Sequence, residues 1–109
     1  MQKLNKQQTV EKLLQNFDFD KVHRVMKSMN WKWWDASTED GVPSVGHLVL
    51  QAKYLLDEVY NKVAAGENYY WLSTGGFEAI SRNYENGEIV LELKFVVTSF
   101  NYSTQDTCY

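Results

Sequence analysis

A short hydroxyl- and glycine-rich segment is the part of this chain best suited to chemistry. Ser73, Thr74, Gly75 and Gly76 follow one another, and such a segment can present backbone N–H groups and hydroxyls to an anion. It is not a Walker loop, because no Gly-x-x-x-x-Gly-Lys-Ser/Thr motif occurs. Glycine runs beside strands more often mark bulges or bends than ligand loops. The segment therefore predicts a structural joint first and a modest anion-binding loop second.

Aromatic and basic residues elsewhere could complete such a site. Tryptophans stand at 31, 33 and 34, and aromatic rings combined with a few cations hold nucleotides in many small proteins. Lys21, Arg24 and Lys27 share one side of an expected helix, which is most simply a solvated face. The residues expected to bind a small anionic ligand are Arg24, Lys27, Trp31, Lys32, Trp34, Tyr70, Ser73, Thr74, Gly75 and Gly76.

The sequence contains no recognisable catalytic or metal-binding motif. There is no Gly-x-Ser-x-Gly elbow, and Ser73 and Thr74 have no obvious base. His23, His47 and Cys108 provide no zinc spacing. The carboxylates form no recognisable pair in a predicted cleft. We therefore expect a binding protein with no catalytic residues, no metal and no cofactor, rather than an enzyme.

Length and charge narrow the class of protein. A chain of 109 residues with 44% hydrophobic residues predicts one domain with its own core. Residues 1–34 carry a net charge of +4 and residues 35–109 carry −7, a balance that disfavours general coating of nucleic acid. No signal peptide or run of 18 apolar residues occurs, and one Cys allows no internal disulfide. We expect a cytoplasmic protein without a membrane segment.

Three helices are expected before the sheet. The first covers residues 7–16 with Thr9 as its N-cap, and the second runs from Asp18 or Asp20 to about residue 29. The main helix is predicted over 44–65, with Ser44 capping its start and Gly66 ending it. Residues 31–34 are interpreted as a strand in which Trp31 and Trp33 point one way and Lys32 and Trp34 the other.

The sheet is expected from residues 69–74, 77–84 and 88–99, with the glycine pair breaking or bending the chain between the first two. A two-residue Asn-Gly turn would place charges opposite apolar residues. A three-residue turn over 85–87 instead places Phe77 opposite Phe95 and Glu78 opposite Lys94. We choose the second register. Residues 1–100 then form a single domain, and residues 101–109 are expected to be a polar tail.

The predicted fold is α+β, with two to three helices on one face of a small, mainly antiparallel sheet of three to four strands. The outer face of this sheet is mixed rather than plainly solvated. Ile80, Tyr84, Val90 and Val96 lie on it beside charged residues. We expect another element, or a second subunit in a homo-oligomer, to cover part of it. Arg82 and Tyr84 are the candidate contacts for a protein partner.

Five segments together resemble small uncharacterised proteins of tailed phages and prophages. They are Phe17-Asp-Phe-Asp-Lys-Val-His23, Met29-Asn-Trp-Lys-Trp33, Val42-Pro43-Ser44, Ser73-Thr-Gly-Gly-Phe77 and Leu91-Glu-Leu-Lys-Phe95. The resemblance spans roughly residues 17–97 and brings no catalytic residues. It implies a protein of the host cytoplasm that counteracts host defence. Such a protein acts by sequestering a nucleotide-like ligand or, alternatively, by covering a host protein as an inhibitor or assembly factor.

Overall fold

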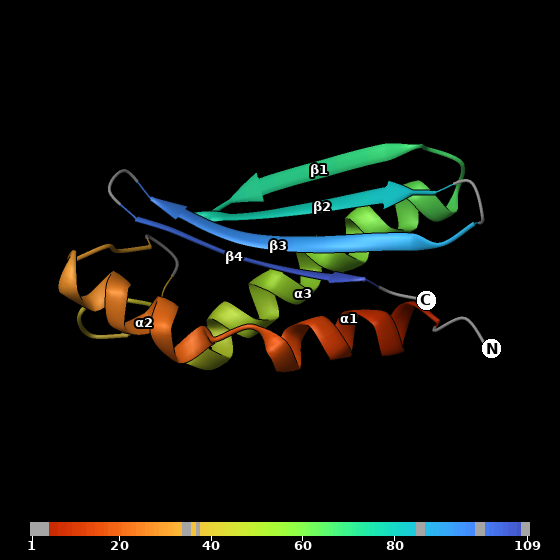
Figure 1. The fold of residues 1–109 in the computed structure, drawn as a ribbon. Helices are drawn as coiled ribbons and strands as arrows, with labels where there is room; N and C mark the ends of the chain where they lie inside the picture. The colour runs from red at the N-terminus through yellow and green to blue at the C-terminus, as the bar shows by residue number, and fades with distance from the viewer. Residues whose placement is uncertain (1–4, 34–35, 37, 85–86, 98–99, 108–109) are drawn as a thin grey trace.

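The chain folds as three helices on one side of an antiparallel sheet (Figure 1). The computed structural model describes residues 5–33, 36, 38–84, 87–97 and 100–107, with side chains through Val96. The helices are α1 (Lys6–Asn16), α2 (Phe19–Ser28) and α3 (Val45–Ala64). The strands are β1 (Tyr69–Thr74), β2 (Phe77–Asn83), β3 (Ile89–Val97) and β4 (Phe100–Thr107), in the sheet order β1-β2-β3-β4. The predicted α+β class and the long helix are confirmed.

The ends of α3 form as their sequence predicts. The Ser44 hydroxyl accepts a hydrogen bond from the backbone N–H of His47 at 3.1 Å, which satisfies one free donor of the first turn. At the other end Gly66 has a φ of +126°, and the N–H of Glu67 donates to the carbonyl of Lys62 at 3.1 Å. This six-to-one bond is the Schellman arrangement that glycine favours.

Helix α1 begins earlier than predicted. Its N-cap is Asn5 and not Thr9, because Asn5 and Gln8 exchange side-chain-to-backbone hydrogen bonds of 2.8 and 3.1 Å. Thr9 lies inside the helix and is buried. Asp18 caps α2 by accepting from the N–H of Lys21 at 3.0 Å, one of the two alternatives that the sequence left open.

The predicted register of the β2–β3 hairpin is confirmed. Phe77 pairs with Phe95, Glu78 with Lys94, and Ser81 with Leu91. Residues 85 and 86 of the expected three-residue turn lie outside the described residues. Apolar pairing across the hairpin therefore selects the register, since a slip by one residue would send every apolar side chain to the other face.

Two expectations for the rest of the sheet need correction. Gly75 and Gly76 do not bend one strand but reverse the chain, so that β1 and β2 form a hairpin in which Thr74 pairs with Phe77. The polar segment expected as a tail from residue 101 pairs with β3 from Phe100 to Thr107. Its Ser/Thr-rich composition gives little hydrophobic signal, but an edge strand can be polar because its backbone supplies the bonds.

The core lies between the helices and the inner face of the sheet. Phe77 and Phe95 meet edge to face across the hairpin with ring centroids 5.2 Å apart. Around them lie Phe17, between α1 and α2, and buried apolar side chains of α1, α2, α3, β2 and β3: Val10, Leu13, Phe19, Val22, Met26, Leu48, Ala52, Leu55, Leu56, Val59, Ala79, Leu91 and Leu93. The small Ala79 and Ser81 are fully buried beneath the helices.

Candidate functional site

Trp33 and the glycine pair of the predicted ligand loop are in direct contact. The indole Nε1–H of Trp33 donates to the carbonyl of Gly75 at 3.2 Å. A Cβ added at Gly75 would lie 2.6 Å from Cζ2 of Trp33, so only glycine leaves room for this ring. The structure therefore brings the tryptophan segment and the 73–76 segment together, and the indole itself fills the space above Gly75.

The two glycines also have a conformational task. Gly75 and Gly76 have φ angles of +60° and +93°, as a two-residue hairpin turn of type I′ requires. A Cβ on Gly76 would lie 2.8 Å from Cε1 of Phe95, and the Gly76 carbonyl accepts from the N–H of Val96 at 2.8 Å. Both glycine carbonyls thus have protein partners, which supports the role of a structural joint.

The segment 31–33 is held as an irregular loop and not as the predicted strand. The backbone N–H of Trp31 donates to Met26 at 2.8 Å, and that of Trp33 donates to Gly41 at 2.9 Å. Trp31 packs edge-on against Phe95 with ring centroids 6.4 Å apart. Trp31 and Trp33 are both half-buried against the core, while Trp34 lies outside the described residues. The hydrogen bonds of Trp31 to the end of α2 and of Trp33 to Gly41, and not a sheet ladder, therefore set the path of residues 31–33.

The ring of His47 completes this aromatic junction. It stands nearly perpendicular to the Trp33 indole, at 86° and 5.1 Å between centroids. Since His47 belongs to the first turn of α3, the contact ties the loop to the start of the long helix. Trp33 and His47 lie too far apart in the chain for a local pattern, so the sequence does not reveal this ring contact.

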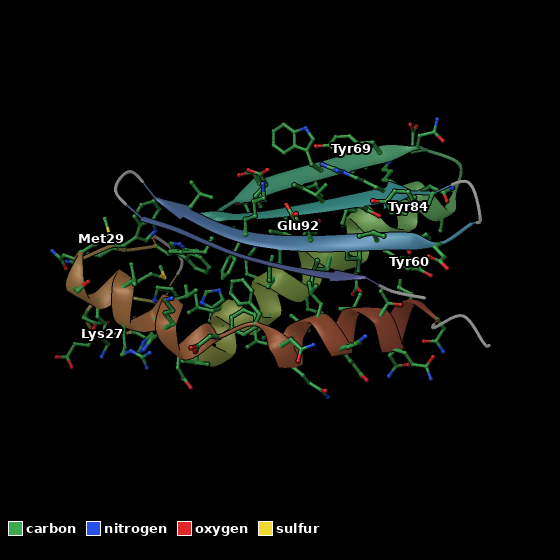
Figure 2. All side chains as sticks on the ribbon, in the orientation of Figure 1. Lys27, Met29, Tyr60, Tyr69, Tyr84 and Glu92 are labelled. Carbon is green, nitrogen blue, oxygen red and sulfur yellow. The ribbon has the colours of Figure 1, made fainter. Side chains whose placement is uncertain are left out.

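The predicted basic contacts are at the surface but are not all directed at the junction. Arg24, Lys27 and Lys32 are exposed, and Figure 2 shows Lys27 on α2, at the end of the molecule remote from Tyr84. The stem of Lys32 lies against Gly41, where an added Cβ would come within 3.2 Å of its Cδ. The charge of Lys27 acts on Asp40 and helps to lower the pKa of that carboxyl. The charge of Lys27 thus acts on the loop of residues 38–42, which contains Asp40.

Asp40 organises that loop. Its carboxylate accepts from the N–H of Val42 at 3.1 Å, and the Thr38 hydroxyl donates to the Val42 carbonyl at 2.6 Å. The hydrogen bond from Val42 is the main cause that lowers the pKa of Asp40, although some desolvation of the exposed carboxyl opposes it. Residues 38–42 are therefore held by their own hydrogen bonds.

The remaining predicted ligand residues divide into two groups. Ser73 and Thr74 are exposed beside the glycine turn. Tyr70 lies further back on β1, five residues from Gly75, which is about 16 Å along a strand. Its ring is half-buried on the helix side beneath Lys62, with Nζ 5.6 Å from the ring centroid. Tyr70 is therefore not part of the Trp33–Gly75 junction.

Two surface depressions lie elsewhere on the helices. One of about 420 Å³ is lined by α1, α2 and α3 around Phe17, Phe19 and Val49. The other, of about 230 Å³, lies between α1 and α3 beside Lys6, Lys53 and Asp57. Neither includes Trp33 or Gly75. Within the described residues, no three His, Cys, Asp or Glu side chains are close enough to hold a metal ion.

A second candidate surface is the sheet face turned away from the helices. None of the described helices lies on that face (Figure 1). Four large apolar side chains at its register positions stay exposed: Tyr69 (46%), Trp71 (52%), Tyr84 (50%) and Val96 (42%). Beneath them Ile80 and Val90 are buried. We call these six residues the outer-face patch.

Three charged side chains of this face, Arg82, Glu92 and Lys94, are paired or stacked. The Arg82 guanidinium lies over the Tyr69 ring, 5.5 Å from its centroid, and Lys94 Nζ lies 3.1 Å from a Glu92 carboxylate oxygen. Figure 2 shows Tyr69 and Glu92 on the side of the sheet away from the helices. The expected partner contacts Arg82 and Tyr84 are both exposed on this face.

Tyr69 and Trp71 were not among the residues predicted for a partner surface. The register of β1 places Trp71 opposite Ile80 and Tyr69 opposite Arg82. The signal was present, because a two-residue turn at Gly75-Gly76 would have aligned these aromatics with the outer residues of β2. Treating the glycines as a bend removed that alignment.

No protein-family model, curated protein or solved structure matches this chain. In the part of the chain that the structure describes, no helix is long and apolar enough to span a membrane.

Proposed function

We propose that this chain is a non-enzymatic binding protein whose outer-face patch docks against another protein. One observation carries the proposal. Tyr69, Trp71, Tyr84 and Val96 leave 42–52% of their surface exposed on a sheet face without a described helix. Large aromatic side chains on an open face are typical of the residues that dominate binding energy in protein interfaces.

The polar groups around the patch suit a protein interface. Glu92 and Lys94 pair with each other, and Arg82 stacks on Tyr69. An apolar centre with a rim of polar residues is the usual anatomy of such surfaces. Because these three charged groups already have neighbours within the chain, a partner that covers the patch would not leave them buried without a partner.

The phage resemblance suggests where the partner is found. The two charged halves of the chain and the open patch suit a protein that covers a component of the bacterial host, in the host cytoplasm, as an inhibitor or assembly factor. A host-defence protein is the class of target that the resemblance implies.

The test is capture from bacterial lysate with a matched set of surface variants. The double variant Tyr84→Ser with Val96→Ser should lose the captured protein, because both side chains belong to the patch. The control Tyr54→Ser removes a ring that is 61% exposed on α3 and should retain it. Equal capture by both variants, with circular dichroism showing each folded, would remove the outer face as the docking surface.

A small anionic ligand is the second candidate function. It is favoured by one observation: the Trp33 indole bonds the Gly75 carbonyl, and the exposed Thr74 and Lys32 are the chain neighbours of these two residues. The matching experiment is a melting-temperature panel with nucleotides. A shift that depends on ligand concentration and is lost in Ser73→Ala and Lys32→Ala supports it, and no shift at ligand excess rules it out.

A further inference from the structure

Strand β1 is an edge of the sheet whose free side has a regular hydrogen-bonding pattern. The N–H of Asn83 donates to the carbonyl of Asn68 at 3.0 Å, and the β1–β2 register continues from that pair. In an antiparallel ladder alternate residues bond the same neighbour. Tyr70, Leu72 and Thr74 therefore face β2, and the backbone groups of Tyr69, Trp71 and Ser73 point outward from the edge.

This edge lacks the features by which proteins usually protect such strands. Its sequence, Tyr-Tyr-Trp-Leu-Ser-Thr, contains no charged residue and no proline. The pairing with β2 runs from Tyr69 to Thr74 without a bulge. Natural edge strands normally carry lysine, proline or a bulge that prevents pairing with another chain. An edge without them is suited to pairing.

We propose that β1 pairs with β1 of a second copy of this chain, antiparallel and centred on Trp71, in a two-fold dimer. Trp71 would then face Trp71 of the second copy, and Tyr69 would face Ser73. This register uses all three outward N–H groups and all three outward carbonyls of each copy. It needs no other sequence to satisfy them, which favours a second copy over an unrelated peptide.

Side chains fit the same arrangement on both faces. On the helix side, Tyr70 and Leu72 are each half-buried in one copy and lie opposite each other across the dimer. On the outer side the two Trp71 rings, each 52% exposed, become neighbours. No like charges meet along the paired strands. The sheet would continue through the two-fold axis, and the outer-face patch of each copy would stay accessible.

Sedimentation or light scattering of the full chain tests the pairing. The wild-type protein should have twice the chain mass at submillimolar concentration. Trp71→Lys and Trp71→Glu should each be monomeric because like charges would lie opposite each other, and their mixture should restore the dimer. Tyr54→Lys, a change on α3, should stay dimeric. A monomeric wild type, an unaffected dimer in Trp71→Lys, or no dimer in the mixture overturns the proposal.

Cross-linking tests the register independently of charge. In a Cys108→Ser background, Trp71→Cys should form a disulfide-linked dimer on oxidation, because directly paired residues have Cα atoms about 5.5 Å apart. Tyr69→Cys should not, since the two copies of residue 69 would lie about 13 Å apart along the strands. Cross-linking at 69 and not at 71 contradicts the pairing. The purified chain should dimerise with no other protein present. The result of this experiment is therefore independent of whether the outer-face patch docks against another protein.

Discussion

Gly75 is the residue where conformation and packing limit the chain most tightly. Its φ of +60° disfavours any residue with a Cβ, and the space beside it is taken by Trp33. We expect Gly75→Ala to lower the free energy of unfolding by about 2–4 kcal/mol, the sum of left-handed strain and a lost indole hydrogen bond. Urea unfolding measures the loss, and a shift in tryptophan fluorescence would report the displaced ring.

Gly66→Ala is the control for this prediction. Gly66 also has a positive φ, +126°, but nothing lies within 4 Å of an added Cβ. Its substitution should cost only the backbone strain, about 1–2 kcal/mol, and leave the fluorescence unchanged. A Gly75→Ala variant no less stable than Gly66→Ala would show that the Trp33 contact contributes nothing to the fold.

The contribution of Asp40 to the stability of the fold should depend on pH only in the acidic range. The hydrogen bond from Val42 N–H lowers its pKa below the usual 3.8. A carboxyl whose pKa is lower in the folded state stabilises the fold above its unfolded pKa, and this contribution is lost as the pH falls through the lowered value. The stability gap between wild type and Asp40→Asn should therefore be present at neutral pH and narrow below pH 3.8. Urea unfolding at both pH values measures it, and a constant gap would contradict the assignment.

The inner face of β2 allows a reciprocal test of buried polarity. Ser81 is fully buried, and among the described residues its hydroxyl has no hydrogen-bond partner, whereas the neighbouring Ala79 is apolar and equally buried. Ser81→Ala should leave the free energy of unfolding unchanged or raise it by up to about 1 kcal/mol. Ala79→Ser should lower it by about 1–3 kcal/mol, because it buries a new unsatisfied hydroxyl.

Thermal or urea unfolding of the two variants measures these opposite effects. The two variants, Ser81→Ala and Ala79→Ser, lie on the same face of the same strand and exchange the same two residue types in opposite directions. Strand, face and volume are therefore matched between them. A destabilising Ser81→Ala would mean that the hydroxyl is bonded in solution, for example to a water molecule.

At the scale of elements, the sequence predicts most of what depends on local pattern. Ser44 and Gly66 bound α3 because caps act within one turn, and the β2–β3 register follows from apolar residues facing each other. The start of α1 was placed too late because Thr9 is also a good cap by type. Strand β4 was missed because its pairing depends on a neighbouring backbone and not on its own hydrophobicity.

The candidate site was predicted only in part for a related reason. The contact between Trp33 and Gly75 joins residues 42 positions apart, so no local spacing reveals that the ring fills the expected ligand space. Tyr70 and the tryptophan loop were grouped by composition, but strand alternation and length separate them. By contrast, Arg82 and Tyr84 were placed on the outer face by the hairpin register alone.

At the scale of the whole molecule, one sheet carries both the outer-face patch and the free edge of β1. The principal extents are 46 × 23 × 22 Å, with the helices on one face and the outer-face patch on the other. Edge pairing through β1 would extend this sheet sideways and place two patches on one continuous face. A partner with its own two-fold symmetry could then contact both, and the linked patches would bind it more tightly than a single one.

Hydrogen exchange gives a readout of the pairing for each residue. In a monomer the N–H groups of Tyr70, Leu72 and Thr74 bond β2 and should exchange slowly, while those of Tyr69, Trp71 and Ser73 face solvent and should exchange fast. In the proposed dimer all six are bonded, so the alternation should disappear as the protein concentration rises. Trp71→Lys should restore the alternation at every concentration while the β3 amides stay protected. Persistent fast exchange at Tyr69, Trp71 and Ser73 in concentrated wild-type protein would leave the edge unpaired and exclude the two-fold sheet.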